Sequence, residues 1–473
     1  MADQDLAFTP AWRLRELVIS KQVSPVELTE LFLSRIETLN PRLNAYLTVA
    51  ADQALADARR AEAGVNSGAD LGALHGIPIS IKDLNLTKGV RTTRGSLVYK
   101  DFVPDADEIV VARIRSAGAI ILGKTNTPEF GHSATTENLL GDDGRNPWDP
   151  ERTSGGSSGG AAAGLAAGLH PLAQGSDGGG SIRIPASLCG VYGIKPTQGR
   201  VPRPYPSPGG WGQFSQNGPM ARNVRDVALL LQVMAGPDPD DPTSINEPPP
   251  DFSASLEAGV RGLRFGWSPD LGSLLVDPEV RRITQEAAKV FETLGASVED
   301  AEVDLDHQQI REVFGTIWIS DQAANFGELV TTRGEEITPF FRENVEEALR
   351  WPAFKLALAL RELEWHRARV DAIVQRYDLL LTPTLATAAF PVGQRPQIID
   401  GEAIDPVWGF TPFTFPINMS GHTAASIPCG FSSEGLPIGL HIIGRRGDEA
   451  TVLRASAAFE QARPWADRRP VVS

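Results

Sequence analysis

The sequence predicts an α/β fold with a mixed, mostly parallel central sheet flanked on both faces by helices. Short apolar runs typical of buried strands alternate along the chain with segments whose apolar residues repeat at helical spacing. The 473 residues are 41% hydrophobic and 22% charged, which is ordinary for a globular chain with a sizeable core. No internal repeat is visible, and we predict a single domain over residues 1–473.

The first predicted elements are a capped helix and a strand–helix–strand unit. The segment Ser24–Glu27 is a capping box with Pro at the first helical position, and apolar residues then recur at helical spacing. The apolar run Ile77–Ile81 predicts a buried strand that delivers Lys82 at its end. Glu108–Ala117 has a helical pattern, and Ala119–Leu122 indicates a second strand. This order favours parallel pairing of the two strands.

The segment from Gly155 to Gly193 has the most unusual composition in the chain. GGSSGGAAAG leads into a helix of small residues and then into AQGSDGGGSIRIP, whose four glycines nearly exclude regular structure. Such a run indicates that the backbone approaches another group closely. The loop that follows from Val201 is rich in Pro and Gly.

The second half of the chain continues the alternation. We predict a helix at Val224–Met234, a strand at Leu263–Trp267, an amphipathic helix at Pro278–Leu294 and a strand at Asp378–Leu381. Between the first two of these elements, GPDPDDPTSINEPPPD has the composition of a linker and is the one plausible internal boundary.

Composition also excludes several functions. The net charge is −15 and no basic cluster offsets it, so independent binding of tRNA or DNA is not expected. The N-terminus lacks the basic and apolar regions of a signal peptide, and the longest apolar stretch, 161–173, is interrupted by glycines and Pro171. We therefore expect a cytoplasmic protein without membrane spans. Cys189 and Cys429 are too few for a zinc cluster, and we expect two buried thiols.

Two short motifs suggest other chemistries. Gly118–Thr125 matches the phosphate-loop pattern, but its variable residues form an apolar strand after a helix, so we reject nucleotide binding. Gly155–Gly159 matches the nucleophile elbow of α/β-hydrolases and leaves an esterase with a His base as an alternative. The preceding NPWDPERT is turn-like, and His366, His422 and His441 lie in helical or apolar settings typical of structural histidines.

A third constellation combines Lys82, Ser157 and Ser181. A serine hydroxyl is a weak nucleophile at neutral pH and needs a base, and a buried lysine that has lost its charge can serve. The run Gly178–Ser181 adds consecutive N–H groups beside a hydroxyl, which suits a tetrahedral oxyanion. Taken singly, Lys82 is better explained by a salt bridge to Asp83 or another acid, and the glycine run can also be a flexible turn.

Together these segments resemble the amidase signature family over nearly the whole chain. The matching stretches are GIPISIKD at 76–83, GGSSGG at 155–160 and GSDGGGSIRIPASLCGVYGIKPTQGRV at 175–201, flanked by GKTNTPEF, NPWDPERT, DLLLTPT and GFSSEGLPIGLHIIG. The resemblance implies the amidase signature fold, with a signature core at about 72–202. A peripheral helical and loop segment at about 236–375 would shape the substrate pocket.

The resemblance also implies a role for each site residue. Ser181 would be the acylated nucleophile, Ser157 a bridging serine after a cis peptide bond, and Lys82 the base. The two serines lie 24 residues apart, as in the family. The implied oxyanion hole is formed by the amides of Gly178, Gly179, Gly180 and Ser181, and the implied supporting residues are Asp177, Arg183 and Ser158. Where the family usually has Asp-Thr-Gly-Gly-Ser, this chain has Gly178, which should keep the N–H donors but loosen the loop.

We therefore expect an amidase that hydrolyses a C–N bond of an amide or carbamate through a Ser181 acyl-enzyme, with no metal or organic cofactor. One alternative is the A-type component of a glutamine-dependent amidotransferase, which usually has Gln where this chain has Ile184 and which would need a partner for tRNA. A catalytically silent relative is another alternative.

Aromatic residues in loops near predicted strand ends indicate the substrate pocket. They are Tyr205, Trp211, Phe214, Trp408 and Phe410. These rings favour aryl or apolar substituents over free glutamine, whereas residue types do not separate aryl acylamides, oligoamides and carbamates. The expected partner is a small-molecule amide or carbamate, with no nucleic acid and no membrane, and we expect a monomer or homodimer.

Overall fold

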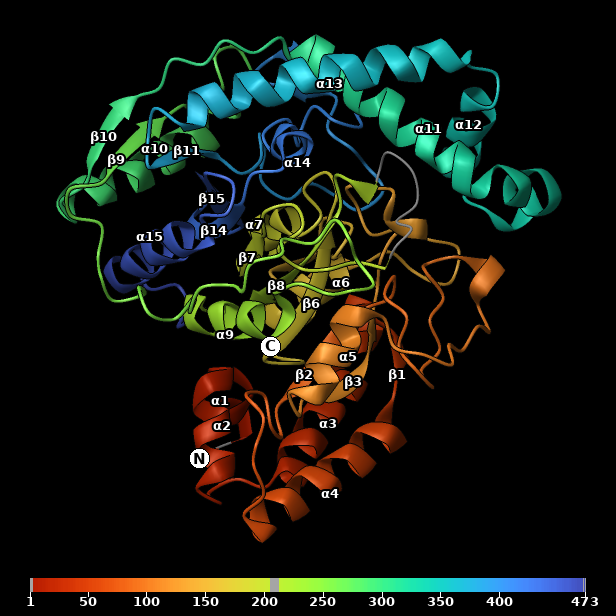
Figure 1. Cartoon of the computed structure of the whole chain (residues 1–473), viewed down its shortest axis with the longest axis vertical. Coiled ribbons are helices and arrows are strands. Elements are labelled where there is room, and N and C mark those ends of the chain that lie inside the picture. The colour runs from red at the N-terminus through yellow and green to blue at the C-terminus, as the bar shows by residue number, and fades with distance from the viewer. Residues whose placement is uncertain (1–2, 205–211, 471, 473) are drawn as a thin grey trace.

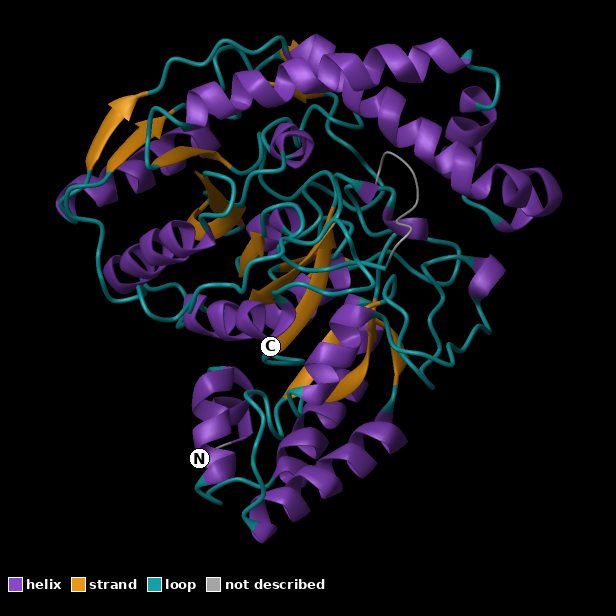
Figure 2. Ribbon diagram, in the orientation of Figure 1, coloured by secondary structure: helices purple, strands orange, loops and turns teal. Residues whose placement is uncertain are grey.

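The protein, seen in a computed structural model that describes residues 3–204, 212–470 and 472, is built around one long sheet. In the described residues this sheet has 11 strands in the order β1-β3-β2-β6-β8-β7-β14-β15-β11-β9-β10 (Figures 1 and 2). The strands are β1 (Tyr46–Val49), β2 (Pro78–Lys82), β3 (Ile120–Thr125), β6 (Leu172–Asp177), β7 (Tyr192–Lys195), β8 (Gln216–Ala221), β9 (Arg264–Trp267), β10 (Ser297–Asp300), β11 (Leu379–Pro383), β14 (Ala424–Phe431) and β15 (Pro437–Gly444).

Helices cover both faces of this sheet. They are α1 (Asp3–Phe8), α2 (Ala11–Ile19), α3 (Pro25–Leu43), α4 (Ala51–Ser67), α5 (Ile109–Ser116), α6 (Gly159–Ala166), α7 (Arg183–Cys189), α9 (Val224–Met234), α10 (Pro278–Thr293), α11 (His307–Arg333), α12 (Pro339–Ala348), α13 (Ala353–Val374), α14 (Phe415–Ser420) and α15 (Glu449–Ala462). Helices α6 and α7 pack together against the middle strands, and α9, α10 and α15 form a second layer. The predicted mixed sheet with helices on both faces is confirmed.

Parallel pairing occurs in two blocks of the sheet. Strand β2 pairs in parallel with β3 and β6, and β9 pairs in parallel with β10 and β11. The strands between the blocks, from β8 to β15, pair antiparallel, and β14 and β15 form a hairpin. The strand–helix–strand prediction is confirmed, because Lys82 at the end of β2 faces Thr125 of β3 in parallel register.

Local signals placed several elements correctly. The Ser24 side chain and the Glu27 carboxylate form the reciprocal capping box that begins α3. Helix α9 has the bounds that periodicity predicts, and Asn223 caps it. The predicted strands near 263–267 and 378–381 correspond to β9 and β11.

Two segments correct the sequence-based prediction. The glycine-containing stretch Leu172–Asp177 is a central strand, β6, rather than irregular. The physical reason is pairing: all six residues pair with β8, and glycine suits the crowded position 175, where a Cβ would lie 3.1 Å from Met220 Sδ and from Ser158 Oγ. The segment predicted to be turn-like before Ser157 forms a short hairpin, β4 (Arg145–Asn146) with β5 (Asp149–Thr153), outside the main sheet.

The three helices α11, α12 and α13 lie together at the top of the view in Figure 1. Helix α11 packs against both α12 and α13, and α13 also packs against α14. This group falls within the segment 236–375 that is predicted to shape the substrate pocket, and that division of the chain stays a prediction. A two-stranded sheet, β12 (Ile398–Ile399) with β13 (Glu402–Ala403), follows later in the sequence.

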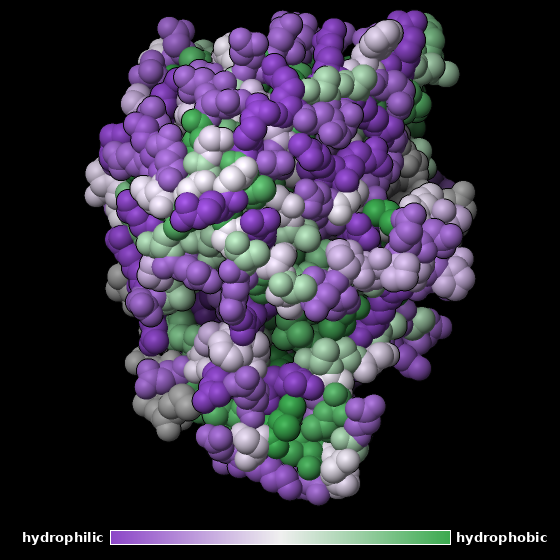
Figure 3. Space-filling view, turned by 60° about the vertical axis from the view of Figure 1, so that its left-hand side comes forward, coloured by the Kyte–Doolittle hydropathy of each residue, from purple (hydrophilic) through white to green (hydrophobic). Residues whose placement is uncertain are grey.

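The surface is largely hydrophilic on the face drawn in Figure 3, with small groups of hydrophobic residues between charged ones. Over residues 3–204, 212–470 and 472, no helix has the length and apolar character that crossing a bilayer requires. Both cysteines are free thiols, Cys189 fully buried and Cys429 partly buried.

Candidate active site

Lys82 is the last residue of β2, and its side chain is completely buried. Its Nζ donates to Ser157 Oγ at 2.7 Å and to Ser176 Oγ at 3.1 Å. Burial lowers the pKa of Lys82 to about 7, although the negative charge of Asp177 acts in the opposite direction. An amine with this pKa is partly neutral at neutral pH and can accept a proton from the hydroxyl it touches.

Two other buried lysines provide a comparison. Burial also lowers the pKa of Lys124 to about 8 and that of Lys195 to about 7. However, Lys124 Nζ donates to the hydroxyl of Thr92 at 2.8 Å and to the carbonyl of Asn85, and Lys195 Nζ donates to the carbonyl of Pro196 at 2.9 Å. Lys82 differs from both because the hydroxyl that it contacts belongs to Ser157, a candidate catalytic residue. Lys124 belongs to the rejected phosphate-loop motif, and it lies on a strand, β3.

Ser157 lies between β5 and α6, and the Gly156–Ser157 peptide bond is cis, as the resemblance implies. A Cβ at Gly131 would lie 3.4 Å from Ser157 Oγ, so this glycine is in close contact with the hydroxyl. Gly131 also borders a small slot that Ser181 lines. Gly131 thus lies beside Ser157 and at the slot of Ser181, and the amide of Ser158 donates to the carbonyl of Ser181 at 3.1 Å.

The slot beside Ser181 has a volume of about 20 Å³, enough for one water-sized group. Its walls are formed by Gly131, His132, Ser133, Ala134, Gly179, Ser181, Ile184, Trp318 and Trp408. Ser181 is 8% exposed and lies two residues before the start of α7. A hydroxyl in this position is reachable from the slot but shielded from bulk water.

The predicted oxyanion donors do not all remain available. The amide of Gly180 donates to Asp177 Oδ1 at 2.8 Å, so this group is committed to the loop rather than to a ligand. The amides of Gly178, Gly179 and Ser181 have no acceptor among the residues that the structure describes. The Gly180 amide is therefore not free to bind a ligand, because a carboxylate inside the turn accepts its N–H, and the other three donors remain a prediction.

Asp177 and Arg183 form a buried ion pair beneath this loop. Arg183 Nε donates to Asp177 Oδ2 at 2.9 Å and Nη2 donates to Oδ1 at 3.0 Å. Burial raises the pKa of the Asp177 carboxyl, but Arg183 and the Asn418 amide outweigh burial and hold this pKa well below its usual range. The pair therefore stays ionised and fixes the turn. Ser158 supports the neighbouring strand end by donating from Oγ to the Ser176 carbonyl at 3.2 Å.

The histidines of the esterase alternative are occupied elsewhere. His441 Nε2 lies 3.0 Å from Arg183 Nη1, His366 Nε2 lies 2.8 Å from the Pro416 carbonyl, and His422 Nδ1 lies 3.0 Å from Ser420 Oγ. Burial lowers the pKa of His366 to about 4 and that of His422 to about 4. These contacts place none of the three beside Ser157, whose hydroxyl contacts Lys82 instead.

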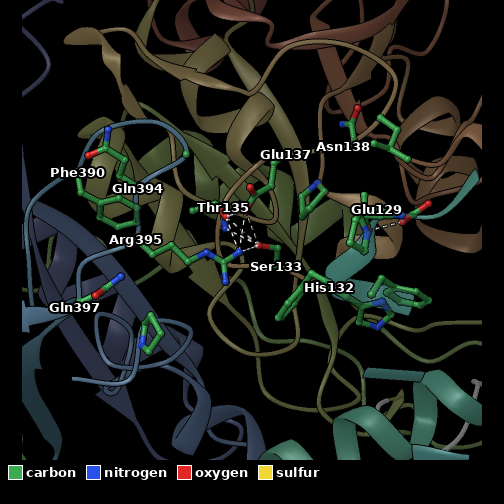
Figure 4. Close-up of a pocket in the computed structure, with 18 residues that line it drawn as sticks. Glu129, His132, Ser133, Thr135, Glu137, Asn138, Phe390, Gln394, Arg395 and Gln397 are labelled. Carbon is green, nitrogen blue, oxygen red and sulfur yellow. Dashed lines mark hydrogen bonds and ion pairs between the residues drawn. The ribbon is translucent and has the colours of Figure 1, made fainter. Parts of the chain in front are cut away.

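A much larger cavity, of about 820 Å³, adjoins the slot across His132 and Ser133 (Figure 4). Its apolar walls include Phe340, Phe341 and Phe390. Burial and the nearby Lys82 charge lower the pKa of His132 to about 3, so this ring adds a neutral, flat surface.

Polar groups gather at another part of the same cavity. Arg395 reaches toward Ser133, Thr135 and Glu137, as the dashed lines in Figure 4 mark, and its Nη2 donates to Glu137 Oε1 at 2.8 Å. The Arg395 guanidinium also lies over the Phe340 ring at 5.3 Å. The cavity therefore offers aromatic surface near the slot and a few fixed polar groups, the usual character of a small-molecule site.

The predicted pocket aromatics have different positions. Trp408 lines the slot, and its ring packs nearly perpendicular to Trp318 with centroids 5.1 Å apart. Phe410 is fully buried and packs edge-on against Phe390 at 4.9 Å, so it supports the cavity wall from behind. Phe214 is 1% exposed and belongs to a core cluster, not to the wall. The other two predicted residues, 205 and 211, lie outside the described residues.

Sequence reasoning missed most of the cavity wall. The unpredicted residues are Gly131, His132, Glu137, Trp318, Phe340, Phe341, Phe390 and Arg395. The stretch from Gly131 follows GKTNTPEF directly and was the one available signal. The aromatic residues of α11 and α12 carry no local mark, because the same side chains at helical spacing also form ordinary core. Over the described part of the chain, no group of three or more His, Cys, Asp or Glu side chains could hold a metal ion.

Comparisons with known proteins point to the same class of enzyme, an amidase. The family model described as Amidase matches residues 27–453. An acylamidase from Rhodococcus erythropolis is 39% identical over 100% of this chain and 99% of its own length. The A-type component of the glutamyl-tRNA(Gln) amidotransferase from Moorella thermoacetica is 39% identical over 98% of this chain and 99% of its own length. A solved bacterial aryl acylamidase of the amidase signature family superposes with a TM-score of 0.91 at 34% identity, covering 97% of each chain.

Proposed function

The chain belongs to the amidase signature family and is a hydrolase of amide C–N bonds, and we propose that Ser181, Ser157 and Lys82 perform the hydrolysis. The observation that carries this proposal is the contact between the buried Lys82 amine and the Ser157 hydroxyl, beside Gly131, which borders the slot that Ser181 lines. The first residue would be the nucleophile, the second a proton relay and the third the base.

In the acylation step, Ser181 Oγ attacks the substrate carbonyl carbon as its proton moves to Ser157 Oγ. The proton of Ser157 moves in turn to the neutral amine of Lys82. A C–O bond forms, and the carbonyl electron pair moves onto oxygen, where the amides of Gly178, Gly179 and Ser181 can donate to the oxyanion.

The tetrahedral intermediate then collapses. The C–N bond breaks while the relay returns a proton from Lys82 through Ser157 to the leaving nitrogen, so an amine leaves and an acyl-enzyme remains. Water attacks the ester carbonyl with the same relay taking its proton. Ser181 regains its hydrogen, and a carboxylic acid, or a carbonic acid monoester from a carbamate, is released.

The proposed substrate is an amide or carbamate with an aryl or apolar substituent. Its support is the aromatic wall of the 820 Å³ cavity, the neutral His132 ring and the two indoles at the slot. Flat aromatic surfaces gain from stacking and burial, whereas a zwitterion would need paired charges of its own.

A second candidate is the glutamine-hydrolysing component of an amidotransferase. The Moorella relative, which is named as such a component, is as identical to this chain, at 39%, as the acylamidase is. This role would require a partner for tRNA, because a chain of net charge −15 offers no basic surface of its own. Hydrolysis of free glutamine and co-purification with a second protein would identify it.

Active-site labelling tests the proposed nucleophile. A serine-directed fluorophosphonate should add one phosphonyl group, and peptide mass mapping should place it on Ser181. Ser181→Ala should abolish labelling and lower kcat by about a thousandfold or more while the fold remains. Ser157→Ala should lower both the labelling rate and kcat.

Ser187→Ala is the matched control, since Ser187 is a buried serine on the same helix that follows the nucleophile. It should label and turn over like the parent protein. If the phosphonyl adduct maps to Ser157, or if Ser181→Ala keeps near-normal hydrolysis rates, Ser181 is not the nucleophile. An esterase with Ser157 in a nucleophile elbow is then the better proposal.

A further inference from the structure

Trp408 borders two cavities. One is the slot that Ser181 lines, and the other is a cavity of about 240 Å³ that the proposed chemistry does not use. Phe415 lines this second cavity, and its Cβ lies 3.8 Å from the place that a Cβ at Gly179, a residue of the slot, would take. Trp408 therefore stands between the candidate nucleophile and a further space inside the molecule.

The walls of the second cavity are formed by the first turns of α11, the start of α14 and two loop segments, 273–275 and 403–412. Arg311 Nη1 lies 3.7 Å from Asp405 Oδ2, so these two charges of the wall balance each other. The apolar residues of the wall are Leu274, Leu275, Ile404, Pro412 and Phe415. A cavity that is lined in this way suits an apolar group such as an alkyl chain.

A tight turn and a cluster of rings hold Trp408 in its place. Asp405 Oδ1 accepts from the Trp408 amide at 2.9 Å, and the Asp405 carbonyl accepts from the Gly409 amide at 2.7 Å. A Cβ at Gly409 would lie 2.5 Å from that carbonyl oxygen, so the turn requires glycine there. The Trp408 ring packs edge-on against Phe314 and Trp318 of α11, in each case with centroids 5.1 Å apart. Trp408 is therefore a fixed wall of the slot.

An amide carbonyl at Ser181 carries two substituents, the amine and the acyl group, which point in different directions. The aromatic cavity of about 820 Å³, which adjoins the slot across His132 and Ser133, can take the aryl amine of an anilide. The acyl group then occupies the slot itself, whose volume of about 20 Å³ suits a group as small as a methyl. A longer acyl chain would need the space on the other side of Trp408.

We propose that Trp408 restricts the enzyme to short acyl groups, and that the cavity of about 240 Å³ is a latent site for longer acyl chains. This inference rests on the proposed function, because it takes Ser181 as the nucleophile and an aryl amine as the leaving group. A smaller side chain at position 408 would join the slot to apolar walls, where added methylenes of the substrate gain binding in the transition state. Trp318 lines the slot but not the second cavity, so shortening it opens no such space.

Hydrolysis of a series of anilides, from the acetyl to the octanoyl compound, tests this inference. In the parent protein kcat/KM should fall by about tenfold or more along the series. In Trp408→Ala the ratio of kcat/KM for the octanoyl to the acetyl compound should rise by about tenfold or more, and Trp408→Leu, which keeps an apolar contact with Phe314, should raise it by less. Trp318→Ala is the matched control, because it shortens the other indole of the slot and should leave this ratio as in the parent.

Alkyl fluorophosphonates separate this inference from the proposed function, because they react with the nucleophile without a leaving amine. An ethyl probe should label Ser181 in the parent protein. The labelling rate of a dodecyl probe relative to the ethyl probe should rise by about tenfold in Trp408→Ala. If neither probe labels Ser181, the proposed function and this inference both fail. If the ethyl probe labels Ser181 but Trp408→Ala keeps the parent's dependence on chain length, or Trp318→Ala changes it equally, only this inference is overturned.

Discussion

At the residue scale, burial lowers the pKa of Lys82, Lys124 and Lys195, and the atoms beside each amine separate their roles. The Lys82 amine contacts the Ser157 hydroxyl at 2.7 Å, whereas the hydroxyl beside Lys124 belongs to Thr92, which lines neither the slot nor the large cavity. In the glycine run, too, the neighbouring atoms decide the role of each group. The Gly180 amide already donates to Asp177, so it is not available to a ligand, whereas the amides of Gly178, Gly179 and Ser181 are.

The pH profile should report the Lys82 ionisation. The neutral amine is the active form, so kcat/KM should rise as pH increases through about 7, the pKa to which burial lowers this group, and level off above it. Lys82→Ala should remove this limb along with most of the activity. The measurement is kcat/KM for one neutral substrate from about pH 5 to about pH 10.

Lys195 provides the control for that profile, because its pKa is also lowered to about 7. Lys195→Met, checked for folding by circular dichroism, should leave the position of the limb unchanged. A limb that follows Lys195, or one that persists without Lys82, would assign the base elsewhere.

At the element scale, the active site depends on two contacts: a buried ion pair that holds the loop between β6 and α7, and a contact that holds α12 at the cavity. Beneath the loop, the buried Asp177–Arg183 pair ties the end of the strand to the first turn of the helix. At the wall of the cavity, Glu129 Oε2 accepts hydrogen bonds from both the amide and the hydroxyl of Thr338, the residue just before α12. Helix α12 brings Phe340 and Phe341 to the wall, so this tie positions the wall relative to the slot.

Removing Arg183 should destabilise the whole fold. Arg183→Met leaves the Asp177 carboxylate buried without its cation, and loss of one partner of a buried pair costs about 3–5 kcal/mol. The free energy of unfolding from urea denaturation measures this effect. Activity should also fall, because the oxyanion loop loses its support.

Arg152→Met is the matched control, because Arg152 pairs at 3.0 Å with Glu434 near the surface. That exposed pair should contribute about 1 kcal/mol or less. Equal losses for the two variants would show that the buried pair has no special role.

At the scale of the whole molecule, the site is assembled from segments far apart in the chain. Strand β2 supplies Lys82, the β6–α7 junction supplies Ser181, and α11 and α12 supply aromatic rings. The remaining wall comes from the segment 128–139 and from the loops near Phe390 and Trp408. Substrate preference is therefore a property of the assembled cavity rather than of any one motif.

The substrate preference should follow this cavity. An anilide and an aryl carbamate should have higher kcat/KM than free glutamine or asparagine at the same pH. The cavity offers aromatic walls, and an ammonium or carboxylate left without a partner there would cost about 1–3 kcal/mol each. If kcat/KM for glutamine exceeds that for the anilide tenfold, the proposed aromatic substrate class is wrong and the amidotransferase role is the better proposal.

The sequence alone predicted the mixed α/β class, the parallel β2–β3 unit with Lys82 at a strand end, and the cap of α3. Apolar periodicity and capping residues report the burial and the local backbone of each element, and these act within a few residues. The three candidate catalytic residues were also named from sequence, because their motifs are short and contiguous. The structure adds the contact between Lys82 and Ser157.

Only the tertiary structure decided the rest. The glycine-containing segment 172–177 became a central strand because all six residues pair with β8, and glycine suits the position where Ser158 and Met220 approach. Phe390 lines the cavity, and its ring covers the ring of Phe410, which is therefore a core residue. Local patterns show that a side chain is buried, whereas strand order and helix packing determine which distant residue it meets.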